Sequence, residues 1–165
     1  MLSSVPNSVK KKIAAFLIGA GLLTGVANHE GFRDKAYVPV PGDLVTIGSG
    51  FTKREDGTPV QMGDTITRKE SDIRLKKELQ AYRTRISQCI KVPVTENQAD
   101  AFTSLAFNIG TGAFCKSTLV RKLNLYDYEG ACQEILRWDK FGGKPLKGLT
   151  NRRKDEYKLC LTSQP

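Results

Sequence analysis

The stretch EGFRDKAYVPVPGDLVTIGSG, residues 30–50, is where the sequence changes from a helical to a strand pattern. Glu30 closes an apolar helical run, and the overlapping segment DLVTIGSGFT, residues 43–52, combines β-branched residues, glycines and two-residue alternation. That combination predicts a short strand pair. Helical spacing of apolar residues returns farther along the chain. We therefore expect an α+β fold, with a small N-terminal β-sheet packed on a mostly helical C-terminal body.

Helix-capping residues divide the C-terminal part of the chain into helices. The predicted N-caps are Thr67, Thr95, Ser117, Asp127 or Tyr128, and Thr150. Glu70 and Gln98 follow the first two caps by three residues and complete capping boxes. The stretch FGGKPLKG, residues 141–148, precedes the last helix and is expected to be a loop.

The length and the charge of the chain limit the classes of partner. A chain of 165 residues fits one domain with a real core. Its 26 Lys and Arg against 17 Asp and Glu give a formal charge of +9, which favours encounters with polyanions such as nucleic acid, anionic lipid or cell-wall polymer. The basic residues are scattered, and neither an aromatic RNA-binding signature nor a zinc-finger spacing is present. Charge alone therefore selects a class of partner and nothing finer.

The four cysteines indicate disulfides more than metal binding. They are Cys89, Cys115, Cys132 and Cys160, and none lies in a CxxC arrangement. An even number in a small domain with a candidate export segment points to an oxidising compartment. Of the three possible pairings we favour Cys132–Cys160 with Cys89–Cys115. Four buried free thiols remain the alternative.

The N-terminal segment has the features of a weak export signal or membrane anchor. Lys10–Lys12 precede IAAFLIGAGLLTGVA, residues 13–27, which carry no charge. A positive flank before such a run is typical of a secretory signal, yet a membrane span needs about 20 residues. The segment is therefore a cleaved signal peptide with its site at Gly25–Ala27, a buried core helix, or a weak anchor that later leaves the bilayer. We favour the anchor with release.

Residues suited to acid chemistry cluster around the junction between helix and strand. The single histidine, His29, and the lack of a ligand cluster argue against a metal site, and no GxSxG elbow is present. Desolvation at the end of an apolar helix favours the protonated form of Glu30. With Asp43 and Thr46 across the loop, it makes the set of groups used in glycoside hydrolysis. Spacing alone does not separate these groups from ordinary surface carboxylates.

Several motifs in order resemble the phage-type lysozymes, glycoside hydrolase family 24. They are EGFRDKAY, TIGSG, NQADAFTSLAFNIGTGAF, STLVRKLN, ILRW and GLTNRR, and the likeness runs from His29 to Leu161. The chain most resembles endolysins with an N-terminal signal-anchor-release segment. The resemblance implies a lysozyme-like fold, no cofactor, and cleavage of the β-1,4 bond between N-acetylmuramic acid and N-acetylglucosamine in peptidoglycan.

The same resemblance assigns roles to individual residues. Glu30 matches the general acid of the family, and Thr46 matches its water-positioning threonine. Arg152 resembles an arginine that contacts the catalytic glutamate. Together with Phe107 and Asn108, Arg152 is expected to bind substrate.

Two departures from the family pattern affect the catalytic loop. In the family pattern eight residues separate the glutamate from a second carboxylate. Pro39 stands at the corresponding position here. The spacing to Thr46 is also one residue longer than the pattern. Asp43 is the carboxylate available in the loop, so we nominate it as the second catalytic residue. Phe51 stands where members of the family often have histidine in a GxGH sequence, and we expect packing to replace its contact.

The sequence thus predicts an endolysin for host cell lysis, with residues 1–28 as the basic flank and anchor and residues 29–165 as the catalytic domain. We expect it at the host inner membrane facing the periplasm, then free in the periplasm, as a monomer with no metal and no nucleic-acid partner. A lytic transglycosylase, which needs no water-activating carboxylate, and a nonenzymatic membrane or nucleic-acid binder are the alternatives.

Overall fold

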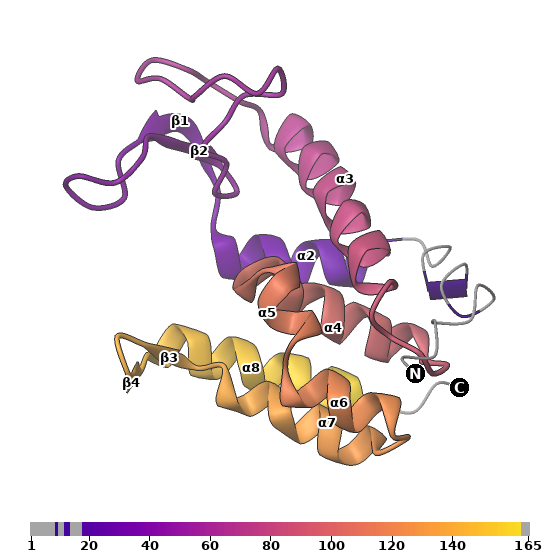
Figure 1. Ribbon diagram of the computed structural model, residues 1–165. Coiled ribbons are helices and arrows are strands. Elements are labelled where there is room, and N and C mark those ends of the chain that lie inside the picture. The colour runs from indigo at the N-terminus through magenta and orange to yellow at the C-terminus, as the bar shows by residue number, and fades with distance from the viewer. Residues whose placement is uncertain (1–8, 10–11, 14–17, 163–165) are drawn as a thin grey trace. The chain divides into compact units, whose positions relative to one another are not determined.

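The chain folds into two compact units in the computed structural model, which describes residues 9, 12–13 and 18–162 (Figure 1). The sheet unit is Gly19–Glu78, and the helical unit combines Met1–Ile18 with Leu79–Pro165. Helix α3, Arg68–Ile86, begins in the sheet unit and ends in the helical unit. The domain boundary predicted after residue 28 falls inside helix α2, Ala20–Glu30.

Helix α2 holds the second half of the apolar N-terminal segment. Its residues Leu22, Val26 and Ala27 are buried. Residues 14–17 of that segment, and Lys10 and Lys11 of its basic flank, lie outside the described residues. Within the described part of the chain, no helix is both long and apolar enough to cross a membrane.

The sheet of the sheet unit has two antiparallel strands, β1, Arg33–Tyr37, and β2, Thr46–Gly48. Arg33 pairs with Gly48 and Tyr37 with Thr46, with an irregularity between. The sequence placed both strands within residues 43–52, which is wrong for the first strand: inside that segment only the isolated bridge Ile47–Phe51 forms. The charged, exposed residues of β1 lack the apolar alternation that would have marked a strand.

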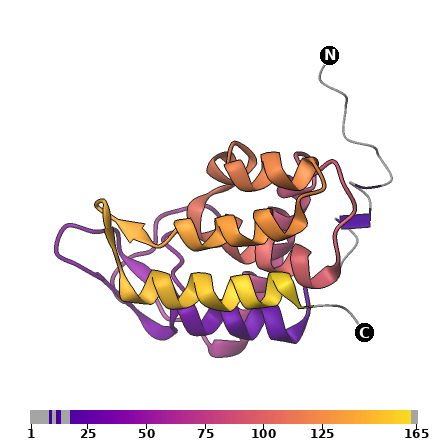
Figure 2. The same ribbon diagram turned by 90° about the horizontal axis from the view of Figure 1, so that it is seen from below.

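The helical unit follows with two longer helices, α4 and α8, several short helices and one hairpin (Figure 1). Its elements are α4, Glu96–Ile109; α5, Thr111–Cys115; α6, Thr118–Asn124; α7, Tyr128–Glu134; the 3-10 helix η1, Ile135–Arg137; β3, Lys140–Phe141; β4, Lys144–Pro145; and α8, Lys147–Leu161. Helix α4 packs on α8, and α6 packs on α7. Helices α7 and α8 also run side by side in both views (Figure 2). The observed architecture is the α+β fold expected from the sequence.

The core of the helical unit is aliphatic and aromatic. Phe102 and Leu105 of α4, Phe114 of α5, and Leu119 and Leu123 of α6 are fully buried in one cluster. Apolar burial of this kind contributes roughly 1.5–3 kcal/mol for each large side chain. It fixes α4 against the surrounding helices, and α4 carries two of the residues predicted to bind substrate.

Most of the predicted caps are confirmed. Thr95 and Gln98 form a reciprocal capping box at the start of α4, and Thr67 and Glu70 exchange the equivalent hydrogen bonds before α3. Ser117 accepts a hydrogen bond from the backbone N–H of Val120, and Asp127 accepts one from Gly130. These helix starts depend on residues three positions apart, which is why the sequence predicts them well.

The start of the last helix is predicted wrongly. Helix α8 begins at Lys147, so Thr150 lies inside the helix, where its hydroxyl donates to Asp139 Oδ2 at 3.0 Å. The preceding stretch contains the β3–β4 hairpin as well as the expected turn. Gly142 and Gly143 take φ angles of 58° and 80°, the left-handed region that a two-residue hairpin turn requires.

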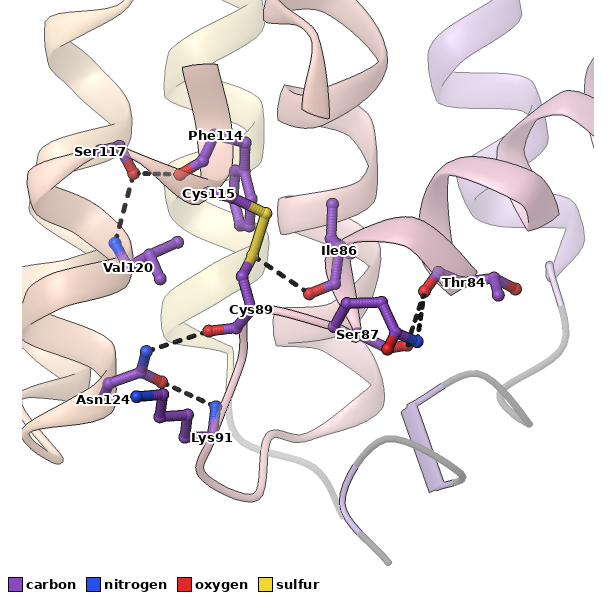
Figure 3. The surroundings of a disulfide bond; sticks show 11 residues. Thr84, Ile86, Ser87, Cys89, Lys91, Phe114, Cys115, Ser117, Val120 and Asn124 are labelled. Carbon is purple, nitrogen blue, oxygen red and sulfur yellow. Dashed lines mark hydrogen bonds between the residues drawn. A yellow bond between two sulfur atoms is a disulfide. The ribbon is translucent and has the colours of Figure 1, made fainter. Parts of the chain in front are cut away.

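Two disulfides cross-link the helical unit, in the pairing favoured from the sequence. Cys89–Cys115 joins the segment after α3 to α5, and Cys132–Cys160 joins α7 to α8, each with Cα atoms 5.7 Å apart. Figure 3 shows that Asn124 braces the first of them, because its amide donates to the carbonyl of Cys89 at 3.0 Å and accepts from the N–H of Lys91 at 2.7 Å. A disulfide that closes a loop of this size stabilises the folded protein by about 3 kcal/mol.

Candidate active site

Glu30 is the last residue of α2, and the backbone around it ends the helix at the carboxylate. Gly31 follows with a φ of 76°, and its N–H donates to the carbonyl of Ala27. Glu30 is half-buried. A Cβ atom added at Gly50 would lie 3.6 Å from Glu30 Oε2, so the carboxylate lies against the backbone of the turn that follows β2. The sheet unit therefore brings the glutamate to the TIGSG turn.

Thr46 opens that turn as the first residue of β2. Its side chain is nearly buried, with 6% exposed, and its hydroxyl donates to the carbonyl of Leu44 at 3.0 Å. Because the hydroxyl proton is used in this bond, the oxygen is left as an acceptor. Pairing of Thr46 with Tyr37 of β1 holds the strand that carries it.

The TIGSG turn is fixed to helix α3 by contacts that the sequence did not reveal. Ser49 is buried, and its hydroxyl lies 3.1 Å from the hydroxyl of Ser71. Gly48 has a φ of 62°, and a Cβ atom there would meet Ser71 Oγ at 2.9 Å. The guanidinium of Arg74 lies 4.1 Å from the centroid of the Phe51 ring, which is buried. Phe51, which departs from the GxGH pattern described above, therefore packs against Arg74 of α3.

Asp43 lies on the exposed loop between β1 and β2. Its backbone N–H donates to the carbonyl of Val40 at 3.0 Å, which closes a turn in the loop. Among the described residues, its carboxylate has no hydrogen-bond or ion-pair partner. Pro39 is exposed on the same loop and offers no polar side chain. Asp43 shares the sheet unit with Glu30 and Thr46, and its predicted role stays a prediction.

The predicted substrate-binding residues belong to the helical unit. The ring of Phe107 packs edge-on against Tyr82, with centroids 5.2 Å apart, and the neighbouring Asn108 is exposed at the end of α4. Arg152 on α8 is 3% exposed and donates to Glu156 Oε1 and to the carbonyl of Ser104, each at 3.3 Å. Glu30 is in the sheet unit, so the predicted contact between Arg152 and the glutamate stays a prediction.

A buried charged cluster that was not predicted from the sequence surrounds Arg152. Glu156 accepts hydrogen bonds from Ser104 Oγ at 2.6 Å and from Arg153 Nη2 at 3.1 Å. Arg153 Nε also lies 2.8 Å from Glu156 Oε2, an ion pair without hydrogen-bond alignment. Burial raises the pKa of the Glu156 carboxyl, and the charges of Arg153 and Arg152 oppose that rise. Two arginines followed by glutamate at helical spacing are the signal that could have predicted the cluster.

The described part of the chain contains no candidate metal-binding site. No group of three or more His, Cys, Asp or Glu side chains there is placed to hold an ion. The groups that remain in the sheet unit are the carboxyl group of Glu30, the hydroxyl of Thr46 as an acceptor and the carboxylate of Asp43 on the loop. These are groups for proton transfer and for orienting water.

Known proteins resemble the chain over most of its length. The family described as phage lysozyme matches residues 27–156. The SAR-endolysin of Enterobacteria phage P21 is 36% identical over 97% of this chain and 99% of its own length. The endolysin of Salmonella phage P22 is 42% identical over 84% of this chain and 94% of its own. The crystal structure of a mutant P22 lysozyme matches with a TM-score of 0.79 and 41% identity, covering 89% of this chain and 99% of that one.

Proposed function

This chain belongs to the phage lysozyme family, and we propose that it cleaves peptidoglycan with Glu30 as the general acid. The protein is an endolysin of the lysozyme type, a glycoside hydrolase that acts on the β-1,4 bond between N-acetylmuramic acid and N-acetylglucosamine to lyse the host cell. The observation that carries the assignment of Glu30 is its position at the end of α2, against Gly50 of the turn that Thr46 opens.

In the proposed mechanism Glu30 protonates the oxygen of the leaving sugar. Thr46 accepts a hydrogen bond from the attacking water, since its own proton is committed to the carbonyl of Leu44. Asp43 acts as the base that removes a proton from this water on the opposite face of the sugar. A water between two carboxylates gives inversion, for which separations of roughly 6.5–9.5 Å are typical.

Substrate binding is assigned to the helical unit. Phe107 offers an aromatic face, Asn108 an exposed amide, and Arg152 a guanidinium held by Glu156. For Arg152 we propose the role of the arginine that contacts the reacting glutamate, because GLTNRR resembles the family sequence around such an arginine. A cation there stabilises the carboxylate that Glu30 becomes once it has given up its proton.

The N-terminal segment is proposed to hold the enzyme at the inner membrane before release. Two relatives matched over 97% of this chain carry the name SAR-endolysin. The uncharged residues 13–27 with their lysine flank support an anchor, and the buried face of α2 supports a second use of the same segment inside the folded enzyme. In this proposal residues 1–28 are the anchor, and residues 29–165 are the catalytic domain.

The location and the assembly state follow from the same proposal. The two disulfides fit an oxidising compartment, which is the periplasm for an enzyme released from the inner membrane. The released enzyme is proposed to act there as a monomer, with its basic surface drawn to the anionic wall and not to nucleic acid. Nothing in the described residues favours the transglycosylase or the nonenzymatic binder over the hydrolase.

Product analysis tests this proposal. Digestion of purified peptidoglycan in ¹⁸O-labelled water should place the label on C1 of a reducing N-acetylmuramic acid, because hydrolysis adds water across the bond. Proton NMR of the first products should show the α anomer if the reaction inverts. A 1,6-anhydro product without label would overturn hydrolysis, and a β anomer would overturn the role given to Asp43 while leaving Glu30 as the acid.

A further inference from the structure

The β3–β4 hairpin exposes two large apolar side chains to solvent. Phe141 of β3 is 78% exposed, and Leu146, which follows β4, is 51% exposed. The hairpin lies at the N-terminal end of α8, the helix into which it leads (Figure 1). A single exposed apolar residue is ordinary on a protein surface. Two on one short hairpin indicate a contact surface if they share a face, which the strand register decides.

The pairing of the strands places Phe141 and Leu146 on the same face of the hairpin. Phe141 pairs with Lys144. The N–H of Leu146 donates to the carbonyl of Asp139 at 2.9 Å, which continues the ladder beyond the two strands. Side chains alternate between the two faces along a strand, and residues directly opposite each other share a face. Phe141, Lys144 and Leu146 therefore form one face, in which a cation lies between two apolar side chains.

Lysines flank this face on both sides. Lys140 is the first residue of β3 and Lys147 the first of α8, and both are exposed, as is Lys144. None of these three, the hairpin lysines, has a hydrogen-bond or ion-pair partner among the described residues. Asp139 at the base of the hairpin accepts instead from the hydroxyl of Thr150 at 3.0 Å. The hairpin thus presents positive charge around two exposed apolar side chains.

The hairpin is ordered before it meets a partner. Gly142 and Gly143 turn the chain with the positive φ angles that a tight hairpin needs. Trp138, directly before the hairpin, packs against the core of the helical unit, and the bond between Thr150 and Asp139 holds the base of the hairpin to α8. Because the backbone is already fixed, docking of this surface costs little conformational entropy.

We propose that this hairpin docks on a bilayer that contains anionic phospholipid. Phe141 and Leu146 enter the headgroup region, and the hairpin lysines lie beside the lipid phosphates. Apolar side chains flanked by lysines are typical of a segment that lies in a membrane interface. Each lysine near an anionic bilayer strengthens binding by roughly fivefold. The contact is reversible and separate from the proposed N-terminal anchor, so it keeps the protein near the membrane surface after the anchor has left the bilayer.

A lipid surface explains the exposed face better than a polyanionic polymer does. Nucleic acid and anionic wall polymer are attracted to the lysines by charge alone. The ring of Phe141 is also able to stack on a nucleic-acid base. Leu146 on the same face gains nothing from stacking or from charge, whereas both apolar side chains gain from leaving water for the interior of a headgroup layer.

The test is the binding of the purified full-length protein to vesicles of phosphatidylcholine with and without phosphatidylglycerol. Trp138 is the one tryptophan of the chain, so quenching of its fluorescence by brominated lipid reports contact close to the hairpin. Phe141→Ser should weaken binding about tenfold, the least expected for loss of a buried aromatic side chain. Lys144→Gln should weaken it roughly fivefold on vesicles with phosphatidylglycerol and leave binding to pure phosphatidylcholine unchanged.

The controls change the same residue types elsewhere in the helical unit. Leu125→Ser removes a leucine that is 80% exposed, and Lys158→Gln removes an exposed lysine three turns along α8 from Lys147. Both should bind and be quenched like wild type. The proposed anchor is the same in every variant, so it does not contribute to the differences between them. Thermal midpoints should match, because all four side chains are exposed.

Equal binding by wild type and Phe141→Ser would overturn the proposal, and so would equal losses in the hairpin and control variants. If Phe141→Ser lowers kcat/KM on vesicle-free peptidoglycan as much as it lowers vesicle binding, the hairpin contacts wall polymer and the proposal fails. Peptidoglycan cleavage is measured separately from vesicle binding. A wild-type protein that cleaves but ignores anionic vesicles therefore contradicts this proposal alone, and one that binds them without cleaving contradicts the proposed function alone.

Discussion

Thr46 and Asp43 contribute unequally to the proposed reaction. The hydroxyl of Thr46 is nearly buried and held by the carbonyl of Leu44, whereas the carboxylate of Asp43 has no partner in the described residues and lies on an exposed loop. A held group positions water without an ordering cost at the moment of reaction. The structure therefore supports Thr46 more strongly than Asp43.

Loss of the Thr46 hydroxyl should lower kcat while leaving the fold intact. Thr46→Ser keeps the hydroxyl and is the control, and Thr46→Ala should reduce kcat on purified peptidoglycan by roughly 10²–10⁴-fold, the range for a residue in acid–base catalysis. Circular dichroism and thermal melting check the fold of both variants. Equal kcat for Thr46→Ala and Thr46→Ser would remove Thr46 from the mechanism.

Acid should weaken the sheet unit through Asp64. The guanidinium of Arg54 donates to both carboxylate oxygens, at 2.8 and 2.9 Å, and lowers the pKa of Asp64 from 3.8 to about 2. A folded-state pKa below the unfolded value gives stability above pH 3.8 that is lost as the pH falls through about 2. Asp64→Asn should therefore melt below wild type at pH 6, with a gap that narrows below pH 3.8 and disappears as the pH falls through about 2. A gap that is constant with pH would contradict this account.

A sequence motif nominates Glu30 and Thr46, whose catalytic roles stay predictions, whereas side chains held by tertiary contacts carry no such motif. Glu30 and Thr46 stand out through the family pattern, and their places in the structure fit the proposed roles. Arg153 and Glu156 could not be predicted as buried residues. A charged pair on a helix is typical of a solvated surface, and here the packing of α4 on α8 buries it. The contact of Ser71 with the turn could not be predicted either, since its partner Ser49 is 22 residues away in the sequence.

At the scale of the elements, the TIGSG turn requires glycine at position 48. At Gly48 a Cβ atom would meet both Ser71 Oγ at 2.9 Å and the Phe51 ring at 3.1 Å, in addition to the strain of a φ of 62°. Gly57 also has a positive φ, of 85°, yet nothing lies within 4 Å of an added Cβ. A comparison of substitutions at Gly48 and Gly57 therefore separates the effect of backbone strain, present at both, from that of steric contact, present only at Gly48.

Gly48→Ala should therefore destabilise the protein more than Gly57→Ala. The strain shared by both variants costs about 1 kcal/mol, and only Gly48→Ala forces the turn away from α3. Urea unfolding measures the difference, and peptidoglycan clearing should fall in Gly48→Ala because the turn also faces Glu30. If both variants lose equal stability, the contact with Ser71 does not constrain the turn.

Helix starts were predicted well, and strand pairing was not. Capping depends on residues three apart, so Thr67, Thr95 and Ser117 reveal their helices directly. The first strand escaped because pairing joins segments across a loop and leaves no local signal in charged residues. Residues 142–143 form the Gly-Gly turn of the β3–β4 hairpin, although the stretch from 141 to 148 is predicted as a loop from its glycines and proline.

For the whole molecule, the central feature is an apolar segment that continues into the helix carrying Glu30. Helix α2 buries Leu22, Val26 and Ala27 in the folded chain, and the same segment is proposed to lie in the membrane beforehand. The sequence predicted both uses from charge and hydropathy. The apolar composition does not distinguish a helix buried in the protein core from one buried in the membrane, because both environments favour the same residues.

A charge in the apolar segment should release the protein from membranes. Leu23 is half-buried in α2, and a lysine there adds roughly 2.5–3.5 kcal/mol to insertion at mid-membrane. Leu23→Lys should move from the membrane to the soluble fraction of expressing cells, whereas Leu44→Lys, at a leucine that is 70% exposed on the β1–β2 loop, should fractionate like wild type. Equal membrane fractions for both variants would place the anchor elsewhere.

The most direct test of the account is the rate of peptidoglycan cleavage by Glu30→Gln. The amide keeps the size of the side chain at the end of α2 and removes the proton that the leaving oxygen needs. Glu55→Gln, an exposed glutamate of the same unit, is the matched control. The account predicts that Glu30→Gln loses at least about 10²-fold in kcat with its thermal midpoint retained, while Glu55→Gln matches wild type. Cleavage by Glu30→Gln at the rate of Glu55→Gln would contradict the central claim.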